Sequence, residues 1–89
     1  MQIDSLKTKC DELLKSEQYE KIITLCDDSL KLDFQNSIAL INKGYALGRM
    51  GRYDEAIDCF NIVLKIKNDD KNTLELIKWI NEESEKIKN

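Results

Sequence analysis

The chain of 89 residues contains no proline and no histidine, and it has only three glycines. Proline and glycine are the residues that most often interrupt helices, so their scarcity favours long helical segments. The apolar residues recur at spacings of three and four instead of alternating, which is the helical period. We therefore predict an all-α fold, and 89 residues allow one domain with a modest core.

The absence of histidine removes the most common general base and one of the usual zinc ligands. The sequence also contains no glycine-rich phosphate loop and no closely spaced pair of metal ligands. No hydroxyl or thiol has a plausible base to activate it. We therefore expect a protein that is not an enzyme and that needs no cofactor or metal.

The three cysteines, Cys10, Cys26 and Cys59, form an odd set without a C-x-x-C pair. We interpret them as reduced thiols that serve as small apolar side chains. A disulfide between Cys10 and Cys26 is the alternative, because both would face the interior of one helix pair.

Charge is neither concentrated nor strongly one-sided. Fourteen Lys and Arg residues stand against seventeen Asp and Glu, which gives a net charge of −3 with both signs interspersed. Without a basic stripe, nucleic acid and anionic membranes are poor partners. The apolar runs are far shorter than the roughly 20 residues that span a bilayer, and charges interrupt the first fifteen residues throughout, unlike a signal peptide. We expect a soluble, cytoplasmic protein.

The segment 42–64 organises the rest of the chain. An amphipathic stretch is followed by Gly51 and then by a second stretch in which Ile57, Phe60 and Leu64 fall on one helical face. Glycine at that point suits the left-handed residue that commonly follows a helix. The segment therefore predicts two antiparallel helices joined by a tight turn.

An internal period of 34 residues extends this pair to most of the chain. The matched positions are apolar and lie on the inner faces of the predicted helices: Leu6 with Leu40, Leu13 with Leu47, Tyr19 with Tyr53, Ile23 with Ile57, and Leu30 with Leu64. Solvent-facing positions do not match. The period is thus structural, and it predicts two consecutive helix pairs.

Five helices are predicted, over about 3–15, 19–32, 37–50, 53–66 and 71–88. Ser37 is the expected N-cap of the third helix. In the fifth helix, Leu74 lies 34 residues after Leu40, while Trp79 and Ile80 continue the apolar face and the sequence becomes mostly charged from Glu82 onward. A helix pair with one apolar face needs a neighbour to cover it, so we expect the last helix to cap the second pair.

The second helix pair resembles the tetratricopeptide repeat family. The resemblance over residues 37–70 depends on the period and on Gly44, Tyr53, Ala56 and Phe60, followed by the ending Val63-Leu64-Lys65-Ile66. This copy departs from the family pattern at Leu40, where tryptophan is frequent, at Lys43, where leucine is common, and at Asn68, where the family usually has proline.

The first pair, residues 3–36, is a weaker copy identified through its register with the second. Cys10 takes the small position, Ile22 and Cys26 replace an alanine and an aromatic residue, and Phe34 replaces the proline. The resemblance therefore implies a single domain over residues 1–89, with repeats at 3–36 and 37–70 and a capping helix at 71–89. It also implies a right-handed superhelix whose first helices line a concave face that binds peptides or proteins.

The expected binding residues are first-helix side chains that do not point into the core. They are Lys7, Ile38, Ile41, Asn42, Tyr45, Arg49, Glu75 and Trp79. Tyr45 and Trp79 are 34 residues apart and so occupy equivalent places on neighbouring helices. The alternative is that the two rings stack on one another, or that Trp79 lies between the fourth helix and the cap.

One use of this family is to grip a C-terminal carboxylate with Lys, Asn and Arg residues from three first helices. Lys7 and Asn42 match two of those positions, but Asp11 stands at the first asparagine, and Asn72 and Leu76 replace a lysine and an arginine. An extra carboxylate repels an incoming one, and two absent cations remove charge-assisted hydrogen bonds. We therefore do not expect a carboxylate clamp.

The sequence thus predicts a protein–protein interaction module that holds a peptide segment or partner helix in the concave groove. The alternative is a self-associating module that buries its groove or an open end in a homo-oligomer, because two repeats are fewer than the three that usually give stability.

Overall fold

The structure, a computed structural model, describes residues 5–88, and this part of the chain contains five helices. They are α1 (Ser5–Lys15), α2 (Tyr19–Leu32), α3 (Ser37–Arg49), α4 (Tyr53–Ile66) and α5 (Lys71–Lys88). No strand occurs within these residues. The all-α class of stacked helix pairs is therefore confirmed. None of the described helices combines the length and hydrophobicity that crossing a membrane requires.

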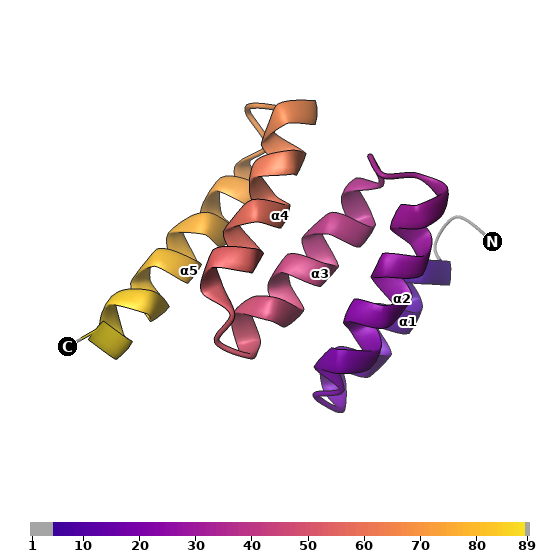
Figure 1. The fold of residues 1–89 in the computed structure, drawn as a ribbon, viewed down its shortest axis with the longest axis horizontal. Coiled ribbons are helices and arrows are strands. Elements are labelled where there is room, and N and C mark those ends of the chain that lie inside the picture. The colour runs from indigo at the N-terminus through magenta and orange to yellow at the C-terminus, as the bar shows by residue number, and fades with distance from the viewer. Residues whose placement is uncertain (1–4, 89) are drawn as a thin grey trace.

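The helices follow one another across the molecule, with the α1–α2 pair at one end and α5 at the other (Figure 1). Each helix packs against the next in sequence, and α3 also touches both α1 and α5. The leading helix α3 thus lies between the other two leading helices, α1 and α5. This is the arrangement that a series of stacked helix pairs produces.

The two hairpin turns share one backbone conformation. Gly51, between α3 and α4, has φ of +82°, as the sequence predicted for a left-handed residue after a helix. Glu17, 34 residues earlier between α1 and α2, has φ of +56°. A side chain in this region clashes with its own backbone, so the first turn holds a strained residue that the sequence analysis did not identify.

The N-cap prediction for α3 was wrong by one residue. Asn36, not Ser37, is the cap: its side-chain oxygen accepts the N–H of Ala39 at 3.1 Å. Ser37 is already helical. The equivalent residue before α5 is Asp70, whose carboxylate accepts a hydrogen bond of 2.6 Å from the Thr73 hydroxyl. Both helices therefore begin after a side chain that accepts a hydrogen bond from the first turn.

The core consists of two groups of buried side chains. One gathers Cys10, Ile22, Cys26, Ala39 and Ala46, and the other gathers Leu47, Ala56, Cys59, Phe60 and Ile80. The first group joins α1, α2 and α3, and the second joins α3, α4 and α5. Helix α3 therefore contributes to both.

Gly44 shows why a small residue is needed in α3. A Cβ atom added there would lie 2.5 Å from the nearest carbon of the Phe60 ring, well inside van der Waals contact. Phe60 is fully buried, so its ring has little room to move. The close approach of α3 and α4 thus depends on the missing side chain.

All three cysteines are free and buried, as the sequence analysis expected. The Sγ atoms of Cys10 and Cys26 lie 4.0 Å apart, in contact but unbonded. The two thiols act as packed apolar groups between α1 and α2.

Helix α5 covers the second helix pair through Thr73 and Ile80, which are both buried. Gly48, which the sequence analysis passed over, lets it approach: a Cβ atom there would collide with Ile80 and lie 2.9 Å from the Trp79 ring. Leu74 behaves differently from its equivalent Leu40, because it is 47% exposed whereas Leu40 is 3% exposed. No helix follows α5 within the described residues to cover Leu74.

Candidate functional site

The leading helices together form a hollow on one face of the molecule. It has a volume of ≈ 230 Å³ and is lined by residues from α1 (Lys7 and Asp11), α3 (Ile38, Ile41 and Asn42) and α5 (Asn72). Because three helices separated in sequence contribute to it, the hollow depends on the stacked fold. We call this face the groove.

The two charges in the hollow offset each other. The Nζ atom of Lys7 lies 3.4 Å from a carboxylate oxygen of Asp11, one helical turn away, and both side chains are exposed. The pair leaves the hollow close to neutral. The remaining lining is aliphatic or amide, so the hollow suits an uncharged group better than an anion.

Asn42 is held in place by its own helix. Its Nδ2 atom donates a hydrogen bond of 2.8 Å to the carbonyl of Ile38. An amide side chain also carries a carbonyl oxygen that can accept hydrogen bonds. Asn42 can therefore offer an acceptor to a bound main-chain N–H beside the aliphatic side chains of Ile38 and Ile41.

Two aromatic rings meet between α3 and α5. The ring centroids of Tyr45 and Trp79 are 5.1 Å apart with an interplanar angle of 25°, which is a stacked arrangement. Both side chains are half-buried, and Trp79 also packs against the backbone at Gly48. The rings thus stack on one another, as one of the two alternatives foresaw, while part of each remains exposed.

Arg49 lies at the C-terminal end of α3 and reaches the first helix pair. Its Nε donates a hydrogen bond of 3.2 Å to the hydroxyl of Tyr19, and its guanidinium carbon lies 6.0 Å from the centre of the Tyr19 ring. The side chain is otherwise exposed. Sequence reasoning placed Tyr19 in the core and missed this contact, which only the relative placement of α2 and α3 creates.

The structure brings some of the eight predicted binding residues together. Lys7, Ile38, Ile41 and Asn42 line the hollow, whereas Tyr45 and Trp79 form the stack. The other two stand apart, since Arg49 pairs with Tyr19 and Glu75 is exposed on α5 without lining the hollow. The hollow also includes Asp11 and Asn72, which were considered as clamp positions but are not among the eight predicted binding residues.

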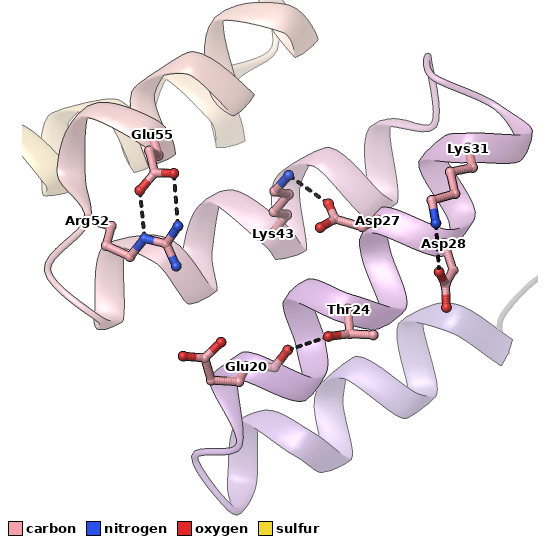
Figure 2. A network of polar contacts seen from close by, with 8 residues as sticks. All are labelled: Glu20, Thr24, Asp27, Asp28, Lys31, Lys43, Arg52 and Glu55. Carbon is pink, nitrogen blue, oxygen red and sulfur yellow. Dashed lines mark hydrogen bonds and ion pairs between the residues drawn. The ribbon is translucent and has the colours of Figure 1, made fainter.

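An ion pair holds the two helix pairs together. Figure 2 shows Lys43 of α3 directed toward Asp27 of α2, and the Nζ–Oδ1 distance is 2.6 Å. The hydrogen bond to Asp27 raises the pKa of Lys43 above its ordinary value, so the ammonium stays charged. Lys43 occupies the position where the tetratricopeptide repeat pattern commonly has leucine. Its ammonium group forms an ion pair with a carboxylate on a neighbouring helix.

The three thiols of the described residues are all buried. Burial raises the pKa of Cys10, Cys26 and Cys59 above the ordinary value of 9.0, so the thiolate that a nucleophile or metal ligand requires is disfavoured. Within residues 5–88, no three His, Cys, Asp or Glu side chains gather in a way that could hold a metal ion.

Comparison with known proteins finds one family that is similar to the second helix pair. The family model described as tetratricopeptide repeat matches residues 37–70, which run from the start of α3 to the residue before α5. No curated protein and no solved structure matches the chain.

Proposed function

We propose that this chain binds a short peptide segment or partner helix in its groove, because residues 37–70 match the tetratricopeptide repeat model and such repeats serve protein–protein interaction. The proposal treats α1 and α2 as a degenerate first repeat and α5 as the capping helix. The observation that carries it is the hollow that α1, α3 and α5 form together.

The lining of the hollow indicates the chemistry of the bound segment. Ile38 and Ile41 favour an apolar side chain, while the amides of Asn42 and Asn72 can exchange hydrogen bonds with a main chain. The Lys7–Asp11 pair offers no unmatched charge. We therefore propose a peptide with an apolar anchor and no required charge, in place of a C-terminal carboxylate.

The exposed parts of Tyr45 and Trp79 extend the binding surface beyond the hollow. Aromatic side chains are enriched among the residues that dominate binding energy, because they bury a large area with few rotatable bonds. A peptide chain crossing the groove would lie over the stack after leaving the hollow. This adds an aromatic contact to the aliphatic one.

Selection from a random-peptide library on the purified chain, followed by affinity measurement by calorimetry, tests the proposal. We expect selected peptides to share an apolar anchor, and Asn42→Ala and Tyr45→Ala each to weaken binding by about tenfold, the size of one lost contact. Lys21→Ala, on the exposed surface of α2, is the matched control and should leave the affinity unchanged.

The proposal fails if both groove variants stay folded, as judged by their melting curves, and bind the selected peptides as tightly as the wild type. It also fails if the peptides are selected for acidic termini and lose their affinity when those termini are amidated, because the hollow would then be acting as an anion site.

A further inference from the structure

A second apolar surface lies on α4 and on the loop between α2 and α3. Phe34 is 75% exposed, Ile62 40% and Ile66 44%, and the three residues line one hollow of ≈ 640 Å³ together with Gln35 and Lys65. This hollow shares no residue with the groove. Several large apolar side chains exposed side by side mark an interaction surface more often than isolated ones do.

Two opposite charges flank Ile62 on the same helix. Asp58 and Lys65 are exposed, and both line the adjoining hollow of ≈ 560 Å³ with Ile62. Neither takes part in any ion pair between described residues. Seven residues are close to two helical turns, so the two side chains lie on one side of α4, about 10 Å apart along its axis. We call Phe34, Asp58, Ile62, Lys65 and Ile66 the α4 face.

The order of these charges makes the face complementary to itself. When two copies of α4 lie antiparallel about a two-fold axis between Asn61 and Ile62, Asp58 of one copy faces the partner's Lys65, and Lys65 faces the partner's Asp58. Ile62 then lies near the axis, with Ile66 and Phe34 beside it. An isologous contact requires this kind of matching, in which each half supplies what the other half needs.

We propose that the α4 face is the site where a second copy of this chain docks, as an antiparallel α4–α4 contact. We choose a second copy as the occupant because the unpaired charges of Asp58 and Lys65 lie on either side of Ile62, so that two copies related by a two-fold axis pair both charges. The dimer leaves both grooves open, so it differs from an oligomer that buries its groove.

The two ends of the helix stack are less suited than the α4 face to docking a second copy. Ala46 of α3 packs against α2, whereas Glu12, its equivalent on α1, is exposed. Gly44 and Leu47 of α3 receive α4, whereas their equivalents on α5, Lys78 and Asn81, are both exposed and polar. Another copy stacking end to end would therefore bury charged or amide side chains without partners.

Sedimentation equilibrium of the full chain up to about 1 mM tests the dimer, since a few apolar side chains and two exposed ion pairs support only weak association. We expect a monomer–dimer equilibrium that shifts toward monomer as salt rises. Phe34→Ser removes a loop side chain that is mostly exposed, and it should weaken the dimer at least tenfold without changing the fold. A wild-type chain that remains monomeric throughout overturns the proposal.

Charge exchange gives the decisive test. In Asp58→Lys both symmetric pairs become cation–cation, and in Lys65→Asp both become anion–anion, so each variant alone should dimerise at least tenfold more weakly than the wild type. Mixed together, the two variants restore two opposite-charge pairs and should form a heterodimer. The double variant should dimerise like the wild type.

Lys78→Asp on α5 and Tyr45→Ala in the groove are the controls, and both should leave dimerisation unchanged. The proposal is overturned if the single charge variants dimerise like the wild type, or if their mixture associates no better than either alone. It is also overturned if Tyr45→Ala abolishes a dimer that the charge variants leave intact, because the groove would then be the interface.

Discussion

Two residues at equivalent turns adopt the same left-handed backbone conformation at different energetic cost. Gly51 and Glu17 both adopt positive φ, but only glycine does so without a clash between its side chain and the backbone. Glu17 is exposed, and its carboxylate makes no hydrogen bond or ion pair with the rest of the described chain. Backbone hydrogen bonds from Glu17 to Leu14 and from Gln18 to Leu13 hold the turn in this conformation, but no side-chain contact of Glu17 offsets its strain.

Glu17→Gly should stabilise the protein. The left-handed conformation costs a non-glycine residue roughly 1–2 kcal/mol, and the substitution removes this cost. Glycine also gives the unfolded chain more conformational freedom, which offsets part of the stabilisation. We expect urea unfolding to report an increase of about 0.5–1 kcal/mol. Gly51→Ala, the reverse change at the equivalent turn, should lower the unfolding free energy by about 1 kcal/mol or more. A destabilising Glu17→Gly would contradict this interpretation of the turn.

Gly44→Ala tests the close contact between α3 and α4. Alanine is the better helix former by about 1 kcal/mol, yet its Cβ would overlap the Phe60 ring, and overpacking typically costs about 1–3 kcal/mol. We expect a net loss of unfolding free energy in thermal or urea denaturation. The loss should shrink in a Phe60→Leu background, where the ring is gone. Equal losses in the two backgrounds would show that the ring is not the cause.

At the scale of the helix, the sequence was most informative where apolar side chains repeat. The period of three and four predicted all five helices because each one buries a stripe of such residues, for example Ile22 and Cys26 on α2. It could not separate Asn36 from Ser37 as the cap, since both residue types cap helices well and the choice depends on the local backbone.

Some features of the candidate site were beyond sequence reasoning for a geometric reason. The groove residues follow from their register on α1, α3 and α5, so Lys7 and Asn42 could be named in advance. The Arg49–Tyr19 contact joins residues 30 positions apart on different helices, and no short-range pattern encodes it. The exposed surface around Phe34 was missed because periodicity shows where a core forms, not where apolar side chains remain uncovered.

Two apolar residues of helix α5, Ile80 and Leu74, should contribute unequally to the free energy of unfolding. Ile80 is 1% exposed against Gly48, so Ile80→Ala leaves a cavity and should lower the unfolding free energy by about 2–4 kcal/mol. Leu74→Ala, at a residue that is 47% exposed, should cost less than about 1 kcal/mol. Thermal melts of the two variants provide the comparison, and similar losses would mean that α5 does not cover the second helix pair as described.

The whole molecule depends on α3, which touches every other helix. Ala39 and Ala46 belong to the core group shared with α1 and α2, while Leu47 belongs to the group shared with α4 and α5. Neither helix pair therefore has a core of its own. We infer that the described chain unfolds as one cooperative unit.

Stability should decline in alkaline solution because of the buried thiols. Burial raises the pKa of Cys10, Cys26 and Cys59, so the folded protein keeps these protons while the unfolded chain loses them as pH rises through 9.0. The unfolded state is then favoured, by up to about 1.4 kcal/mol per pH unit for each thiol. Below pH 9.0 the contribution is fully present.

Urea unfolding under reducing conditions between pH 7 and about pH 10 measures this decline, a range that begins below the ordinary thiol pKa. Cys26→Ala should have a lower unfolding free energy at neutral pH but a shallower fall above pH 9.0, since one of the three titrating thiols is absent. Parallel curves for the variant and the wild type would assign the alkaline loss to lysine and tyrosine instead.

The chain has a single tryptophan, and that indole rests against Tyr45 at the boundary between α3 and α5. Its emission is therefore an intrinsic optical signal from one known place. Any event that separates the two rings or excludes water from their exposed edges will change the wavelength and intensity of this fluorescence, so no added dye is needed. A titration in a cuvette can thus distinguish events at this boundary from those elsewhere on the molecule.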